Sequence, residues 1–172
     1  MKLKCCIFGL GYIGLPTACI LASVGHKVIG VDINSNLIKN LNKGKIDITE
    51  PGLEQALNLA IKKDNFIATS KPISSDVYLI AVPTPFKKDD ENSLKPNIDY
   101  VISAAQSISK VIKKKQMILI ESTCPVGTTL KVYNLIKKNT NFEDGDFSIA
   151  YCPERVLPGN ILSELVNNDR VV

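Results

Sequence analysis

Three glycines near the start of the chain have the spacing of a loop that binds phosphate groups. Gly9, Gly11 and Gly14 stand in the run Gly-Leu-Gly-Tyr-Ile-Gly, directly after a short apolar segment. In such a loop the first glycine allows a tight turn, the second lets a pyrophosphate approach the backbone, and the third lets the next helix pack against the sheet. The start of that helix offers free N–H groups and a partial positive charge. The run predicts a dinucleotide-binding loop, with a plain strand–helix turn as the alternative.

An acidic residue follows the next apolar segment. Asp32 stands at the end of an expected second strand, close to the distance of about 20 residues at which a ribose-binding acid follows such a loop. A carboxylate there accepts hydrogen bonds from both ribose hydroxyls and repels a 2′-phosphate, and residues 33–35 supply no arginine. The pattern therefore predicts NAD rather than NADP as the cofactor, with a helix-capping aspartate as the alternative.

Two further loops after expected strands carry hydroxyl groups. Thr84 stands between Pro83 and Pro85, and two prolines make a short loop rigid. Thr123 belongs to a loop rich in serine and threonine that spans residues 121–129. These hydroxyls either cap the following helix or place Thr123 beside a nicotinamide ring, and composition alone favours neither interpretation.

A third loop, after the last complete strand, carries an acidic and a basic residue side by side. Glu154 and Arg155 lie between Pro153 and Pro158. A carboxylate and a guanidinium at a strand end can serve as a proton acceptor and an anion clamp. A surface ion pair is the alternative interpretation.

The chain has five cysteines and one histidine. No pair of cysteines has zinc-ligand spacing, so no metal site is expected, and the odd number favours free thiols in a reducing cytoplasm. Cys124 and Cys152 lie near the expected site, but neither has a base beside it in the sequence, and we interpret both as packing residues. His26 is interpreted as a loop residue.

Short apolar segments alternate with amphipathic ones along the chain. Strands are expected at 4–8, 27–31, 66–68, 77–82, 117–121 and 148–151, and helices at 12–23, 34–42, 51–63, 98–111 and 130–138. This alternation predicts an α/β fold of Rossmann type, a doubly wound, mostly parallel sheet with helices on both faces. Ligands of such a sheet bind at the carboxyl ends of its strands, where the loops described above must lie.

Composition excludes several other classes of protein. With 172 residues, 45% of them hydrophobic and 22% charged, the chain is long enough for one folded domain and is neither disordered nor collagen-like. The net charge of +4 is mild, and the lysines at 113–115 are interpreted as a solvated turn, so no nucleic-acid partner is expected. No apolar run approaches the roughly 20 residues that span a bilayer, so no membrane partner is expected.

Two segments depart from the regular alternation. Residues 86–96 are rich in lysine and aspartate and predict a mobile loop. Residues 167–172 predict a loop followed by the opening of an apolar strand that nothing completes. We therefore expect residues 1–172 to form one dinucleotide-binding domain of a longer protein.

Five motifs occur in a fixed order along the chain. They are Gly-Leu-Gly-Tyr-Ile-Gly-Leu-Pro, Gly-Val-Asp-Ile-Asn, Ala-Val-Pro-Thr-Pro, Glu-Ser-Thr-x-Pro-Val-Gly-Thr and Cys-Pro-Glu-Arg-Val-Leu-Pro-Gly. Together they resemble the UDP-glucose/GDP-mannose dehydrogenase family over essentially the whole chain, and five ordered motifs are far more specific than one. The last motif is most similar to that of members acting on UDP-N-acetyl-D-mannosamine. Cys124 replaces the valine or serine common in the family, which leaves the role of Thr123 unchanged.

The resemblance implies oxidation of the C6 hydroxyl of a nucleotide sugar to a carboxylate with two NAD⁺, through an aldehyde and a thioester on a cysteine. It implies that Glu154 activates or positions water near Thr123, and that Arg155 and Val156 contact the substrate. The implied cofactor contacts are Tyr12, Ile13, Asp32, Thr84 and Thr123. The nucleophilic cysteine, the essential lysine, a central helix and a UDP-sugar-binding domain are expected downstream, in a homodimer or larger homo-oligomer. This chain alone is expected to bind NAD without turning over the sugar.

Three alternatives stay open at this point. The sugar is UDP-N-acetyl-D-mannosamine or another UDP-sugar, such as the N-acetylglucosamine, N-acetylgalactosamine or glucose form. A β-hydroxyacid dehydrogenase shares the broad architecture but does not need the Pro-Glu-Arg-Val loop. A non-catalytic NAD sensor predicts that the natural gene ends near Val172, whereas an enzyme predicts a cysteine-bearing motif downstream.

Overall fold

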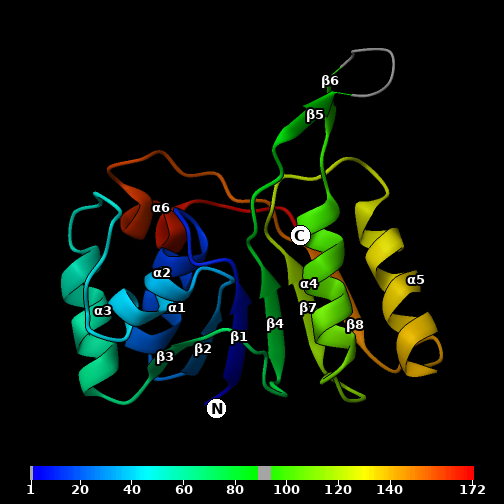
Figure 1. Cartoon of the computed structure of the whole chain (residues 1–172), viewed down its shortest axis with the longest axis horizontal. Coiled ribbons are helices and arrows are strands. Elements are labelled where there is room, and N and C mark those ends of the chain that lie inside the picture. The colour runs from blue at the N-terminus through cyan, green and yellow to red at the C-terminus, as the bar shows by residue number, and fades with distance from the viewer. Residues whose placement is uncertain (1, 89–93) are drawn as a thin grey trace.

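Six parallel strands form one sheet through the middle of the molecule (Figure 1). The structure is a computed structural model and describes residues 2–88 and 94–172. The strand order is β3-β2-β1-β4-β7-β8, which is the order of a Rossmann fold. The bounds are β1 (Lys4–Phe8), β2 (Lys27–Val31), β3 (Phe66–Thr69), β4 (Val77–Ile80), β7 (Met117–Ile120) and β8 (Ser148–Tyr151). The order reverses between β1 and β4, so a ligand cleft is expected at their carboxyl ends.

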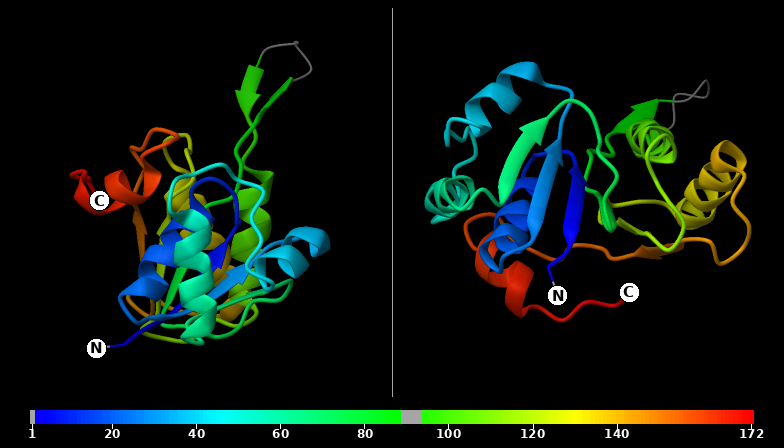
Figure 2. Two further views of the ribbon diagram at one scale, coloured as in Figure 1. Left: turned by 90° about the vertical axis from the view of Figure 1, so that its left-hand side faces the viewer. Right: turned by 90° about the horizontal axis from the view of Figure 1, so that it is seen from below.

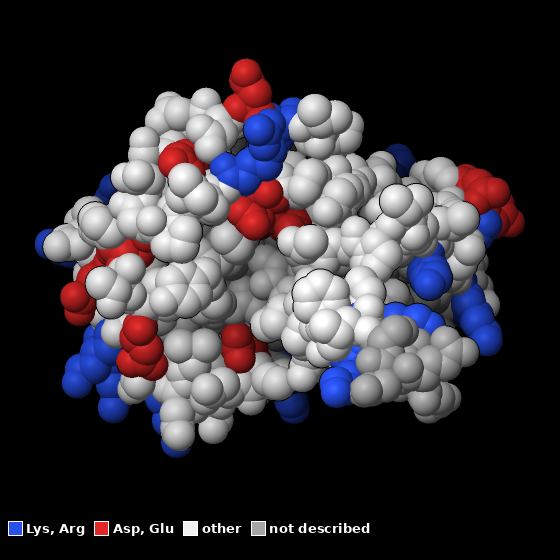
Figure 3. All heavy atoms as spheres, turned by 90° about the horizontal axis from the view of Figure 1, so that it is seen from above, with Lys and Arg blue, Asp and Glu red and all other residues white. Residues whose placement is uncertain are grey.

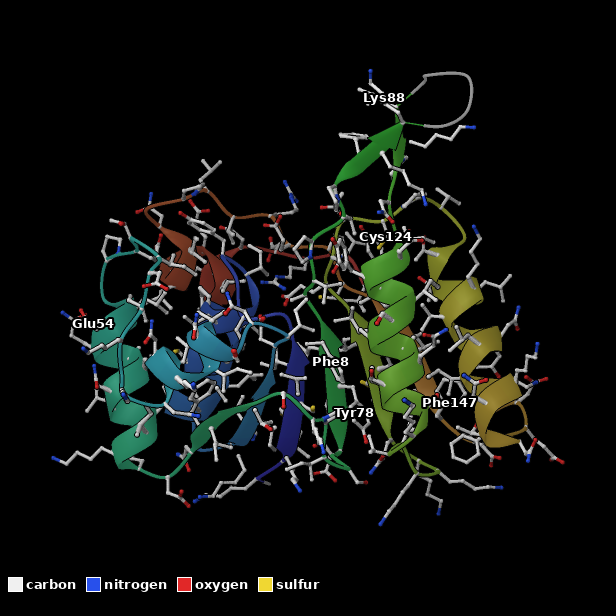
Figure 4. The ribbon with its side chains drawn as sticks, in the orientation of Figure 1. Phe8, Glu54, Tyr78, Lys88, Cys124 and Phe147 are labelled. Carbon is white, nitrogen blue, oxygen red and sulfur yellow. The ribbon has the colours of Figure 1, made fainter. Side chains whose placement is uncertain are left out.

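Helices cover both faces of this sheet (Figure 2). Side chains alternate between the faces along each strand, so Cys6 and Phe8 of β1 pack on one side while Cys5 and Ile7 pack on the other. The first side is covered by α4 (Asp99–Ser109) and α5 (Thr128–Thr140), and Phe8 and Tyr78 lie beneath them (Figure 4). The second side is covered by α1 (Gly14–Ser23) and α3 (Leu53–Lys62). Burial on both faces explains why the strands are almost uninterrupted apolar runs.

The expected fold class and its regular elements are confirmed. Each expected strand and helix is present, with ends within two residues of the expected ones, including α2 (Ser35–Leu41). The lysines at 113–115 form an exposed turn, as interpreted. Among the described residues, no helix is both long and apolar enough to cross a bilayer.

Two expectations near the surface are corrected. Instead of a loop through 86–96, β5 (Phe86–Lys88) and β6 (Leu94–Pro96) pair as antiparallel strands of an arm that stands away from the sheet (Figure 1), and positions 89–93 lie outside the described residues. Three-residue strands rich in lysine and proline carry too little pattern to be distinguished from a loop. A further helix, α6 (Ile161–Asn167), was not among the expected elements, and residues 168–172 form no strand.

Candidate dinucleotide-binding site

A cleft of about 430 Å³ opens at the carboxyl edge of the sheet, where the strand order reverses. Figure 3 views this edge from above and shows a hollow with acidic side chains around it. The predicted site residues that line the cleft come from five separate segments, and they are Gly9, Gly11, Tyr12, Ile13, Asp32, Thr84, Thr123 and Glu154. The parallel sheet therefore brings the first glycine loop and the three later loops to one place.

The glycine loop has a backbone that leaves little space for side chains at two of its positions. Gly9 has a φ of +88°, and an added Cβ would lie 2.6 Å from the carbonyl oxygen of Ala81. At Gly14 an added Cβ would lie only 1.8 Å from the carbonyl oxygen of Gly9, so α1 starts in direct contact with the loop. At Gly11, by contrast, an added Cβ would meet nothing within 4 Å. Space is therefore free beside Gly11, which also lines the cleft.

The start of α1 borders the same cleft. Its N-cap is Ile13, and among the described residues no side chain caps the helix. The leading N–H groups of a helix need an external partner, and an anion is a favourable one because of the helix dipole. The loop and the helix end thus present a surface suited to a pyrophosphate.

Asp32 directly follows β2 and is fixed by two backbone hydrogen bonds. Its Oδ2 accepts the N–H of Leu10 at 2.9 Å, and its Oδ1 accepts the N–H of Asn34 at 2.9 Å. Each carboxylate oxygen has a second lone pair, so both can still accept hydrogen bonds from a ligand. Leu37 of α2 lines the cleft beside it. Leu37 has no role in the sequence analysis, because one leucine in an amphipathic helix gives no signal for a ligand contact.

The hydroxyl-rich loop after β7 does not cap α5. The N-cap of that helix is Gly127, and no side-chain hydrogen bond caps it among the described residues. Ser122 instead donates from Oγ to the carbonyl oxygen of Val82 at 2.7 Å, which ties this loop to the one that carries Thr84. Thr123 is exposed and lines the cleft. The structure therefore does not support the capping interpretation.

Glu154 and Arg155 do not form an ion pair with each other or with another described residue. Oε2 of Glu154 accepts the N–H of Val156 at 3.0 Å, and the side chain lines the cleft. Arg155 is exposed, and neither it nor Val156 lines this cleft. The structure thus brings the acid to the cleft and leaves the two expected substrate contacts outside it.

A buried ion pair that the sequence analysis missed involves one residue of the cleft lining, Glu121. Glu121 is 2% exposed, and its Oε1 lies 2.8 Å from Nη1 of Arg170. The hydroxyl of Thr17 donates to Oε2 of Glu121 at 3.3 Å. Burial raises the pKa of the Glu121 carboxyl, while the hydrogen bonds from Arg170 and Thr17 and the charge of Arg170 oppose that rise. Glu121 lines both the cleft and a second cavity of about 180 Å³, which Cys152 and Arg170 also line.

The two cysteines near the site have different surroundings. Cys124 packs against the core beneath α4 and α5, and burial raises the pKa of its thiol against a hydrogen bond from Thr128. A raised pKa disfavours the reactive thiolate, which agrees with the interpretation of Cys124 as a packing residue. Cys152 lies 3.7 Å from Nη1 of Arg170, in the wall of the smaller cavity.

Comparison with known proteins gives consistent results. Residues 3–172 match the model of the UDP-glucose/GDP-mannose dehydrogenase family, NAD binding domain. The UDP-N-acetyl-D-mannosamine dehydrogenase of Campylobacter jejuni is 48% identical over 98% of this chain and 43% of its own length. The enzyme of the same name from Methanococcus aeolicus is 49% identical over 98% of this chain and 38% of its own. The structure of UDP-N-acetyl-mannosamine dehydrogenase Cap5O from Staphylococcus aureus superimposes with a TM-score of 0.89 at 42% identity, over 97% of this chain and 40% of that one. The chain therefore spans about two fifths of the length of these relatives.

Proposed function

We propose that this chain, which belongs to the UDP-glucose/GDP-mannose dehydrogenase family and carries its NAD-binding domain, takes part in the four-electron oxidation of a UDP-sugar. The C6 hydroxyl of the sugar becomes a carboxylate while two NAD⁺ are reduced. UDP-N-acetyl-D-mannosamine is the proposed substrate, because relatives named for it are 45–49% identical to this chain. The observation that supports this function most directly is the convergence of the glycine loop, Asp32, Thr84, Thr123 and Glu154 on one cleft.

The residues of the cleft fit NAD. The free space beside Gly11 and the uncapped start of α1 suit a pyrophosphate, and Asp32 offers two fixed acceptors to the hydroxyls of a ribose. Thr84 and Thr123, together with Tyr12 and Ile13, are proposed to contact the rest of the cofactor. When bound, NAD⁺ supplies the hydride acceptor of the reaction.

Glu154 is proposed to hold or activate the water that completes the oxidation, beside Thr123. One of its oxygens is already bound to the backbone of Val156, which fixes the carboxylate while leaving the other oxygen available. Arg155 and Val156, just outside the cofactor cleft, are proposed to contact the nucleotide sugar. The cysteine nucleophile and the essential lysine are not assigned to this chain, so we expect it to bind NAD without oxidising the sugar by itself. The five cysteines form no disulfide and fit the proposed cytoplasmic location.

Asp32→Ala tests the cofactor assignment. The substitution removes the proposed acceptors of the ribose, and hydrogen bonds to a charged group contribute about 1.5–3 kcal/mol, so we expect NAD affinity to fall about 10- to 100-fold. Isothermal titration calorimetry of the chain with NAD measures this loss. Unchanged binding would exclude Asp32 from the ribose site.

Asp76→Ala is the matched control for this experiment. Asp76 also accepts one backbone hydrogen bond, from the N–H of Lys4 at 2.8 Å, but it lies at the amino end of the sheet and outside the cleft. Its loss should leave the NAD affinity almost unchanged. An equal loss of affinity in both variants would assign the effect of Asp32 to folding rather than to ribose binding.

A panel of UDP-sugars tests the substrate and the electron count. The full-length dehydrogenase is incubated with limiting amounts of the N-acetylmannosamine, N-acetylglucosamine, N-acetylgalactosamine and glucose forms, and NADH is followed by absorbance. We expect two NADH per sugar for UDP-N-acetyl-D-mannosamine and the largest kcat/KM among the four. One NADH per sugar would contradict a four-electron oxidation, and a higher kcat/KM for another sugar would replace the proposed substrate.

A further inference from the structure

We propose that Glu50, which lies outside the cofactor cleft, is a positioning residue for the loop that carries Glu154 and Arg155. The inference rests on the proposed function, because it concerns the loop to which water activation and sugar binding are assigned. Glu50 stands before Pro51 and Gly52, in the connection between α2 and α3. Its carboxylate is buried, with 7% of the residue exposed.

Both oxygens of Glu50 bind the start of α6, more than 100 residues further along the chain. Oε2 accepts the N–H of Gly159 at 2.8 Å, and Oε1 accepts the N–H of Ile161 at 2.7 Å. The N-cap residue of this helix is Asn160, whose own side chain makes no capping hydrogen bond. A carboxylate from a distant segment therefore caps this helix. Hydrogen bonds to an ionised group are stronger than those between neutral groups, and here they are also buried.

The anchored helix in turn holds the loop before it. Glu164 of α6 accepts the N–H of Leu157 at 2.7 Å, and Asn168 just after α6 donates from Nδ2 to the carbonyl oxygen of Arg155 at 2.8 Å. These two hydrogen bonds attach the loop to α6 and to the residue that follows it. The start of α6 is held in turn by Glu50 and by the buried side chain of Ile161. Figure 1 shows the segment before α3 rising to the edge of the sheet where this loop and α6 lie.

The hydrogen bonds of Glu50 join its own segment to the start of α6, and none of them goes to a residue that lines the cofactor cleft. Glu50 does not line the cofactor cleft, and its backbone carbonyl oxygen accepts the N–H of Leu53, at the start of α3. The phosphate loop and Asp32 are held by their own contacts with each other through Leu10. Loosening the start of α6 should therefore disturb Glu154 and Arg155 while the NAD-binding groups stay in place.

Glu50→Gln in the full-length dehydrogenase tests this inference. The amide keeps one acceptor but turns an N–H donor toward one of the two backbone N–H groups. We expect kcat/KM for the nucleotide sugar to fall about tenfold, with the Kd for NAD within about twofold of the unchanged enzyme. Glu54→Gln is the matched control, because Glu54 lies exposed on the first turn of α3 (Figure 4) and makes no side-chain hydrogen bond to another described residue. It removes the same charge and should change neither quantity.

Amide hydrogen exchange gives a readout that does not depend on turnover. In Glu50→Gln we expect faster exchange at residues 154–157 and 159–161, and unchanged exchange through the phosphate loop 9–14. If NAD affinity falls as much as sugar kcat/KM, or if exchange rises throughout, Glu50 is a general stability residue and the inference is wrong. Unchanged kinetics and exchange would also overturn it.

Two further measurements test the inference if Glu50→Gln does not fold or if the enzyme shows no activity toward UDP-sugars. If Glu50→Gln does not fold, Glu50→Asp retains the charge with a shorter reach, and the same split between sugar kcat/KM and NAD affinity is expected in weaker form. If the unchanged enzyme oxidises no UDP-sugar, the proposed function fails, whereas the exchange experiment still decides whether Glu50 holds the loop.

Discussion

Replacing Arg170 with methionine is expected to lower the free energy of unfolding of this chain by about 3–5 kcal/mol at neutral pH. The substitution leaves the carboxylate of Glu121 buried, with the hydroxyl of Thr17 as its remaining hydrogen-bond partner among the described residues. An unpaired buried charge destabilises the folded state by more than the intact pair stabilises it. Folding removes the carboxylate from water, and without Arg170 no counter-charge offsets that loss. Urea unfolding of both chains at neutral pH measures the difference.

The loss of stability in Arg170→Met should shrink as the pH falls. Burial already raises the pKa of Glu121 in the folded chain, and removing Arg170 removes the main opposing effect, so that pKa rises further. A carboxyl whose folded pKa exceeds its unfolded pKa favours the folded state most at low pH, and this contribution is lost as the pH rises through the folded pKa. Unfolding repeated at about pH 5 should therefore show a smaller difference between the two chains than at about pH 7.

Lys114→Met is the control for the ion-pair prediction. Nζ of Lys114 lies 2.9 Å from Oδ2 of Asp146, but the lysine side chain is 63% exposed. Solvent screens such a pair, so the substitution should leave the unfolding free energy almost unchanged at either pH. A similar loss in both variants, or a loss in Arg170→Met that does not depend on pH, would contradict the role given to the buried carboxylate.

Gly14→Ala and Gly11→Ala are expected to damage the protein in different ways. At Gly14 the new methyl group would overlap the carbonyl oxygen of Gly9, 1.8 Å away, and backbone atoms on both sides must move. Overpacking of this kind typically costs 1–3 kcal/mol and sometimes more, and we expect about 3 kcal/mol here because the clash is with backbone. The displaced phosphate loop should then bind NAD poorly as well.

At Gly11 the new methyl group meets no protein atom within 4 Å, and Gly11 itself lines the cleft. Stability should be unchanged or raised by about 0.4–1 kcal/mol, because alanine restricts the unfolded chain. NAD affinity should nevertheless fall more than about tenfold, because the methyl group occupies space that the pyrophosphate requires. Urea unfolding and calorimetry on the two variants separate these effects. Tight NAD binding by Gly11→Ala would exclude the pyrophosphate from this position, and normal stability of Gly14→Ala would contradict the close contact.

Local patterns in the sequence were sufficient for the six-stranded sheet, the helices α1 to α5 and the cleft. The strands are short apolar runs, the helices have amphipathic spacing, and loops that follow parallel strands must meet at one edge of the sheet. Thr84, Thr123 and Glu154 each follow a strand, so their convergence on the cofactor cleft follows from topology. The arm of β5 and β6 could not be predicted in this way, because three-residue strands have weak local signals. The start of α6 is bound by Glu50, a distant residue, and not by the side chain of its own N-cap, so its neighbouring residues give little sign of the helix.

The sequence by itself determined the fold class, the phosphate loop and the acid that follows β2, because each depends on residue types at fixed short spacing. The tertiary structure alone decided which distant charges meet. Glu50 and the start of α6, or Glu121 and Arg170, are far apart in the chain, and nothing in the residues around either partner specifies the other. Such contacts arise only when the chain folds and buried carboxylates must find partners to offset the loss of water.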